Sequence, residues 1–185
     1  MPIIFMKQTR DLVLLSLLVA LAIALRGIES LIPNPLPWLR LGLANMMTLL
    51  AMLLFGFKAA LLLTTLRIVI ASILFGYFLA PTFFLSLVAG IVSAAAMGVT
   101  LRFGGRAFSP VGVSVVGAVA HNFAQLATAY WLIIKHAEIF MLFPFLSILG
   151  ILTGCFNGWA VVIMREYAQA HLDALLPASI PKESA

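Results

Sequence analysis

The side chains in this sequence with the most capacity for chemistry are charged and amide groups that fall inside long apolar runs. Arg67 lies near the middle of one run, and Arg26 lies near the end of another, three residues before Glu29. A charge at the centre of a bilayer costs at least about 2.5–3.5 kcal/mol on insertion scales, so each should face the protein interior and find a partner there. Residues three apart share one face of a helix, so Glu29 is the expected partner of Arg26.

Two interpretations of these three residues remain open. In the functional one, Arg67 is the fixed positive charge of a polar cavity that binds an anionic or carbonyl-bearing molecule, with Arg26 and Glu29 beside it. In the structural one, Arg26 and Glu29 reach the interface at a helix end, and Arg67 is held by a backbone carbonyl or by Glu29. Both keep the charges away from the lipid tails.

The densest set of polar residues lies in one run in the second half of the chain. His121, Gln125 and Thr128 are spaced by four and three residues and share a helical stripe, with Ser114 two turns earlier and Asn122 alongside. Such a stripe must face protein or water. We expect His121, Asn122 and Gln125 to offer donors and acceptors to a substrate. The alternative is hydrogen bonding between helices, which averages well under about 1 kcal/mol per pair.

Several classes of function lack their signature in this sequence. There is no Walker-type phosphate loop, no Asp-rich pair of the kind that holds magnesium for diphosphate chemistry, and no Ser/His/Asp constellation. Cys155 is the single cysteine, and no Cys/His cluster has the spacing of a metal site. The basic residues are scattered singly, which argues against binding of nucleic acid. We expect neither an enzyme nor an autonomous ATP-driven pump, and no metal or cofactor.

These polar side chains must be positioned by membrane-spanning helices. Hydrophobic residues make up 64% of the 185 residues and charged residues only 9%, against about 25% in soluble domains. A span needs about 20 mostly apolar residues. The predicted spans cover residues 12–32, 41–57, 59–75, 82–101, 111–134 and 140–164. The sequence thus predicts one all-α membrane domain over residues 1–185, a bundle of six transmembrane helices whose first span is retained and is not a cleaved signal peptide.

The distribution of Lys and Arg predicts the orientation of this bundle. With six spans, both termini and the loops after even-numbered spans share one side of the membrane. That side carries seven basic residues, Lys7, Arg10, Lys58, Arg102, Arg106, Arg165 and Lys182, whereas the other side carries two, Arg40 and Lys135. The positive-inside rule therefore predicts that both termini lie in the cytoplasm. We expect the protein in the inner membrane of the cell.

Other residues are expected to shape contacts between helices. Ala20 and Ala24 are four apart in the first span, and we expect them to dock another membrane protein, with packing inside the bundle as the alternative. Asn45 and Asn157 are expected to join helices by hydrogen bonds. Between the first two spans, alternate prolines enforce a stiff loop, residues 33–40, which is expected to cover the outer mouth of the polar cavity. Trp38 in this loop is expected to offer the substrate a flat apolar wall.

Four segments of the sequence resemble a known family. They are Pro35-Leu36-Pro37-Trp38-Leu39-Arg40-Leu41-Gly42-Leu43-Ala44-Asn45, residues 67–76, Phe108-Ser109-Pro110-Val111-Gly112-Val113-Ser114, and residues 117–125 with His121, Asn122 and Gln125. Together they are similar to the membrane family called heptaprenyl diphosphate synthase component I, or Gx transporter, over roughly residues 10–167. The family name implies a helper beside a separate catalytic subunit.

A second resemblance links the chain to the S components of energy-coupling-factor (ECF) transporters. In that family an alanine pattern on the first helix docks a T subunit, which couples to two ATPases. The leading hypothesis is an S-component-like substrate-binding membrane protein for a small vitamin-, flavin- or isoprenoid-related molecule. The alternative is a non-catalytic membrane subunit beside polyprenyl diphosphate synthase or in quinone-linked electron transfer. A transporter should contain a polar pocket of about 300–1,000 Å³, whereas a scaffold should be filled.

Overall fold

Six α-helices make up most of the chain that the computed structural model describes, which is residues 9–31, 42–104 and 108–174. They are α1 Thr9–Leu31, α2 Ala44–Phe55, α3 Phe57–Leu74, α4 Pro81–Phe103, α5 Pro110–Ala129 and α6 Phe143–Ala174. A π-helical turn, η2 Tyr130–Ile134, continues α5, and a 3-10 helix, η3 Ala137–Leu142, leads into α6. These residues contain no strand, and the predicted all-α bundle is confirmed.

Five helical segments of the described chain are long and apolar enough to cross a membrane: α1, α3, α4, α5 with η2, and α6 with η3. The protein is therefore a multi-pass membrane protein. α2 is shorter than the predicted span of residues 41–57. Its 12 residues extend about 18 Å, whereas a bilayer core is about 30 Å thick. Glycines bound it on both sides, Gly42 with φ 79° and Gly56 with φ 90°, and an α-helix cannot continue through that conformation.

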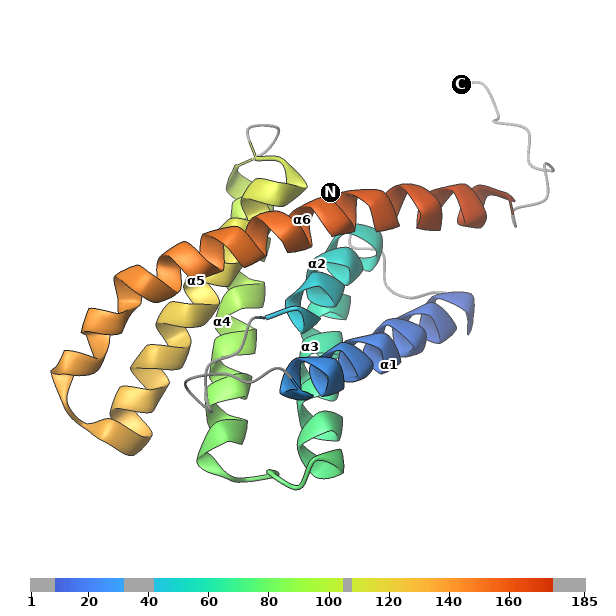
Figure 1. Cartoon of the computed structure of the whole chain (residues 1–185). Coiled ribbons are helices and arrows are strands. Elements are labelled where there is room, and N and C mark those ends of the chain that lie inside the picture. The colour runs from blue at the N-terminus through green and yellow to red at the C-terminus, as the bar shows by residue number, and fades with distance from the viewer. Residues whose placement is uncertain (1–8, 32–41, 105–107, 175–185) are drawn as a thin grey trace.

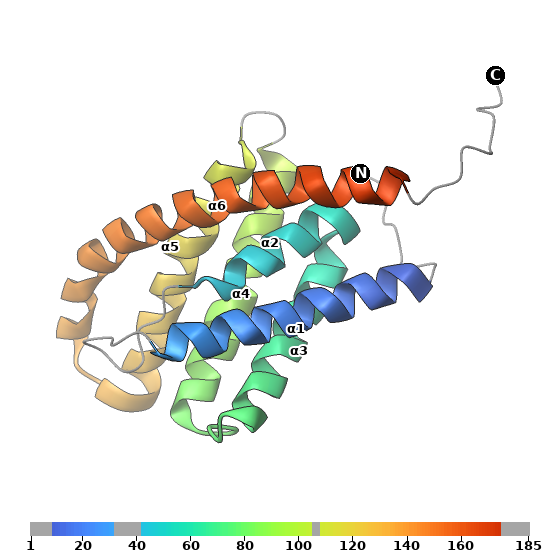
Figure 2. The same ribbon diagram turned by 45° about the vertical axis from the view of Figure 1, so that its right-hand side comes forward.

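The helices form two layers, as Figures 1 and 2 show. α1, α2 and α6 lie in one layer, with α2 in contact with both of the others, and α3, α4 and α5 form the layer behind it. α1 packs on α3 and crosses it steeply, whereas α6 packs on α5 and runs back along it (Figure 2). Buried side chains such as Met47, Leu63 and Met97 fill the space between the layers. A polar site between the layers is therefore shielded from lipid.

α5 and α6 form the most extensive helix pair among the described residues, and glycines of α6 allow their close approach. Gly150, Gly154 and Gly158 recur at every fourth position. A Cβ atom at Gly154 would lie 2.7 Å from Val115 Cα, and one at Gly158 would lie 2.5 Å from Val111 Cα. These distances leave no room for a side chain, so the two backbones pack directly against each other.

Local sequence explains where α4 and α5 begin and where α5 ends. Pro81 and Pro110 lie in the first turns of their helices, where a proline removes no helical hydrogen bond. Ser109 caps α5, since its Oγ accepts a hydrogen bond from the Gly112 backbone N–H at 3.3 Å. At the other end, Lys135 adopts a left-handed conformation, with φ 52°, and terminates η2.

Candidate functional site: a buried polar cavity

Residues 42–45 form a junction that holds the N-terminus of α2 against α1 and α6. Glu29 of α1 is 2% exposed, and its Oε1 accepts hydrogen bonds from the backbone N–H groups of Gly42 at 2.6 Å and Leu43 at 3.1 Å. A helix start leaves such N–H groups without partners, and a carboxylate there also faces the positive end of the helix dipole. Asn157 of α6 donates from Nδ2 to the Gly42 carbonyl at 3.2 Å.

Asn45 extends this junction to the back layer. Its Oδ1 accepts a hydrogen bond from Arg67 Nη2 of α3 at 3.3 Å, and its Nδ2 donates to Ser93 Oγ of α4 at 2.6 Å. Ser93 donates in turn to the Gly117 carbonyl of α5 at 2.8 Å. Buried hydrogen bonds of this kind are strong because the surroundings have a low dielectric constant. The junction therefore connects all six helices, α5 through Ser93.

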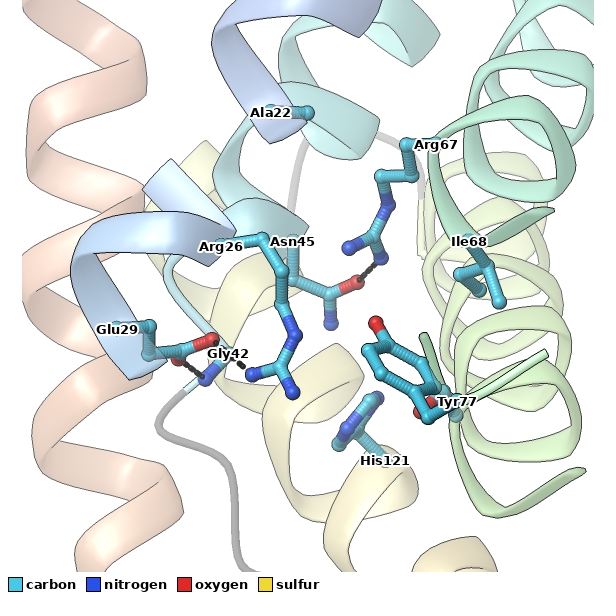
Figure 3. Close-up of a pocket in the computed structure, with 10 residues that line it drawn as sticks. Ala22, Arg26, Glu29, Gly42, Asn45, Arg67, Ile68, Tyr77 and His121 are labelled. Carbon is cyan, nitrogen blue, oxygen red and sulfur yellow. Dashed lines mark hydrogen bonds and ion pairs between the residues drawn. The ribbon is translucent and has the colours of Figure 1, made fainter. Parts of the chain in front are cut away.

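A small cavity lies beside the junction, between the two helix layers (Figure 3). Its volume of about 30 Å³ gives room for about two water molecules. Five helices and the turn after α3 provide its lining, which is Ala22, Arg26, Glu29, Gly42, Asn45, Arg67, Ile68, Tyr77, Ser86 and His121. In Figure 3, the side chains of Arg26, Arg67, Tyr77 and His121 approach one another from different elements.

The charges around the cavity do not balance within the described residues. Arg26 Nη1 lies 3.2 Å from Glu29 Oε2. Arg67 is 8% exposed and forms no ion pair with a described residue. Its hydrogen-bond acceptor among the described residues is the neutral side-chain amide of Asn45. The Nε–H groups of both arginines are buried without an acceptor in this part of the chain. Two guanidinium groups and one carboxylate give the lining a net charge of +1 with His121 neutral, which suits an anion.

Four of the seven predicted substrate-binding residues line this cavity together. They are Arg26, Glu29, Arg67 and His121. They come from α1, α3 and α5, so helices that are far apart in the sequence bring them to one place. The cost of placing such groups in lipid was the basis for expecting them in the interior, and the interior is where they lie.

The other three predicted binding residues lie elsewhere. Asn122 is buried and donates from Nδ2 to the Leu146 carbonyl of α6 at 2.7 Å, so it joins two helices. Gln125 is 2% exposed and is not part of the cavity lining. Trp38 falls outside the residues that the structure describes, and its position over the cavity stays a prediction.

Some cavity residues were not expected from the sequence. Asn45 was assigned only to joining helices, although it stands in the family-like Arg40-Leu41-Gly42-Leu43-Ala44-Asn45 segment that could have marked it. Tyr77 lies in the turn after α3, next to Gly76 with φ 71°, and no spacing rule connects it to the other polar residues. Ser86 belongs to α4 and received no assignment from the sequence.

The two alanines predicted to dock a partner lie on the outer face of α1. Ala20 and Ala24 are exposed, whereas Ala22 between them is fully buried and lines the cavity. Ala20 and Ala24 therefore do not pack inside the bundle. α1 is also the least buried of the five long segments, with 17% of its span buried.

Comparison with known proteins identifies the family. A family model described as heptaprenyl diphosphate synthase component I matches residues 18–164. The chain belongs to this family. The matched residues include the junction and every residue that lines the cavity. A search of curated proteins and a search of solved structures found no match, and no comparison supports the resemblance to ECF S components. The family description names a component of a synthase, which is compatible with a subunit that is not itself catalytic.

Proposed function

We propose that this component I protein is a substrate-binding membrane protein that takes up a small anionic organic molecule at the cavity between α1, α3 and α5. The observation that carries the proposal is the pair of guanidinium groups, Arg26 and Arg67, that line one interior cavity with a single carboxylate, Glu29. The protein is not an enzyme in this proposal. It acts as one membrane domain, and we place both termini in the cytoplasm, which requires the short helix α2 to complete a sixth crossing.

The surroundings of Arg67 support an anionic ligand. A buried guanidinium that lacks a countercharge is costly, and an anion in the cavity would lower that cost. The Nε–H group of Arg67 is without an acceptor in the described chain, while Asn45 fixes one Nη atom. A carboxylate or phosphate can accept hydrogen bonds from two guanidinium nitrogens at once. His121 and Tyr77, which also line the cavity, would add polar contacts.

The volume of the cavity sets a condition on this proposal. Sites for vitamin-sized molecules measure about 300–1,000 Å³, and this cavity measures about 30 Å³. A helix of the lining must therefore move when such a molecule binds. α1 is the candidate because it is the least buried long segment and packs on α2 and α3.

A mobile α1 would also connect binding to partners. Ala20 and Ala24 lie exposed on that helix, and small residues let another membrane helix approach closely. We therefore place the docking surface for a T-type subunit with its ATPases at these two alanines. Those partners would supply the energy for transport.

A second function is favoured by two specific observations. The family is described as a component of heptaprenyl diphosphate synthase, and the cavity is too small for a vitamin-sized ligand without movement. Both fit a non-catalytic membrane subunit that holds a polyprenyl diphosphate synthase or a quinone-linked enzyme at the membrane. In that case Arg67 and its neighbours stabilise the bundle and bind no substrate.

Native mass spectrometry of the protein in a mild detergent separates these functions. An anionic small molecule should copurify with the unaltered protein and be lost from Arg67→Gln. Arg102→Gln is the matched control, because it removes an exposed arginine at the end of α4 and should leave the molecule bound. Copurification of bulk phospholipid alone, with no effect of Arg67→Gln, would contradict the proposal. A copurifying synthase subunit would support the second function.

A further inference from the structure

A second cavity of the described chain is apolar and opens on the outer surface of the bundle. It lies between α4 and the segment formed by α5 and η2, and its volume is about 480 Å³. Its floor consists of small residues of α5, Ala124, Ala127 and Thr128, and its walls include the rings of Phe84, Phe123 and Trp131. We call this cavity the α4–α5 groove.

The groove offers hydrocarbon contacts and no free polar group on its floor. The one hydroxyl of the floor, Thr128 Oγ1, donates to the Ala124 carbonyl of its own helix at 2.7 Å. The aromatic walls are exposed, with Phe84 at 40%, Phe123 at 49% and Trp131 at 74%. Because α4 and α5 cross the membrane, a groove between their outer faces opens to lipid. Lipid hydrocarbon chains therefore have direct access to it.

A cation follows the groove residues along the chain. Lys135 lies four residues after Trp131, where η2 ends, and it is exposed and forms no ion pair with a described residue. The nearby carboxylate, Glu138, faces His136 instead, with Oε2 3.9 Å from Nδ1. Tryptophan and lysine at the end of a transmembrane helix are typical of the membrane interface, where lipid headgroups lie.

We propose that the α4–α5 groove binds one hydrocarbon chain of an anionic lipid whose phosphate lies at Lys135. The apolar groove holds the chain, and the lysine distinguishes the headgroup. This site is separate from the buried polar cavity and does not depend on the function proposed for that cavity.

Trp131 allows occupancy of the groove to be measured directly. The substitutions Trp38→Phe and Trp159→Phe leave it as the single tryptophan. Its fluorescence is followed in vesicles that contain phosphatidylglycerol or phosphatidylcholine with the same brominated chains, since bromine quenches a tryptophan in contact with it. We expect about fivefold tighter binding of phosphatidylglycerol, the effect of one lysine beside an anionic headgroup. Lys135→Gln should remove this preference, and Ala127→Phe, which fills the floor, should weaken quenching by both lipids.

Trp159 provides the matched control. It lies on α6 and is 61% exposed, which is comparable with Trp131, but it is not part of the groove. A variant with Trp159 as its single tryptophan should be quenched equally by the two lipids. Equal quenching of Trp131 by the two lipids, or the same preference at Trp159, would overturn the proposal, because the groove would then hold ordinary surrounding lipid.

Discussion

Glu29 makes three contacts with one carboxylate, two with N–H groups at the start of α2 and one with Arg26. Glu29→Gln keeps an acceptor for α2 but removes the countercharge of Arg26. We expect the free energy of unfolding to fall by about 2–3 kcal/mol, measured by denaturant unfolding in detergent micelles. The double variant Arg26→Met with Glu29→Gln should recover part of the loss, because no unpaired charge remains. Equal losses in the two variants would assign the whole effect to the start of α2.

Arg67 presents a different balance, since its charge has no carboxylate partner among the described residues. Arg67→Gln keeps a donor for the Asn45 amide oxygen and removes the buried charge. We expect the affinity for the copurifying molecule to fall at least about tenfold, while the melting temperature stays the same or rises. His121→Ala should also weaken binding, as measured by isothermal titration calorimetry. If both variants bind normally and melt at lower temperature, these residues serve the structure alone.

The sequence could predict which polar residues are buried but not which of them meet. Arg26, Glu29, Arg67 and His121 share the property that lipid exposure is costly, and this was enough to expect them in the interior. Helical spacing placed Gln125 on the same stripe as His121. One stripe can face more than one neighbouring helix, so residues that share it need not line the same cavity. Contacts that depend on a turn or on a helix start, such as those of Tyr77, follow from tertiary packing and have no local signal.

Among the helices, the α5–α6 pair gives a direct test of packing. Gly154→Leu places side-chain atoms where Val115 Cα already lies, so we expect a loss of about 1–3 kcal/mol in the free energy of unfolding. Cys155→Leu is the control, because Cys155 is the next residue of the same helix and is exposed. It should unfold at the same denaturant concentration as the unaltered protein. Similar destabilisation by both substitutions would show that this turn of α6 tolerates no larger side chain on either face. Close approach to α5 would then not be the cause of the loss at Gly154.

The outer face of α1 can be tested in the same manner. Ala20→Trp combined with Ala24→Trp should abolish association with a partner subunit and leave the isolated protein folded, because both alanines are exposed. Ala22→Trp should instead disrupt the fold, since Ala22 is fully buried. Association is measured by copurification and folding by thermal melting. Loss of folding in the double variant would indicate that this face is needed within the bundle itself.

Most helix boundaries lie close to the ends of the apolar runs, but α6 continues to Ala174, past the predicted end at residue 164, and α2 is shorter than its run. The run of residues 41–57 is long enough for a span, but hydrophobicity does not record the backbone conformation of its glycines. Gly42 and Gly56 both have positive φ, which shortens the helix and turns the chain at each end. Glycine permits this conformation without requiring it, and for that reason the sequence alone predicted a full span.

At the scale of the whole molecule, the charge distribution predicts the orientation. In a Cys155→Ser background, cysteines at Asn34 and Glu138 should react with an impermeant maleimide added to intact cells. Cysteines at Phe103 and Lys182 should react only after permeabilisation. Phe103 is suitable because it is 79% exposed at the end of α4. Labelling of positions 34 and 103 from the same side would exclude the six-span arrangement.

The junction at residues 42–45 also has a consequence for biosynthesis. Asn157 and Gly42 are 115 positions apart, and Asn45 and Ser93 are 48 apart. Helices leave the ribosome in order, so α1 and α2 are made before α4 and α6 exist to bond with them. During that interval the Asn45 amide and the Gly42 carbonyl must stay hydrated or be shielded by the insertion machinery. α6, the last of the described helices, completes the junction that α1 and α2 begin, so a nascent chain interrupted before α6 leaves the Gly42 carbonyl without its Asn157 donor.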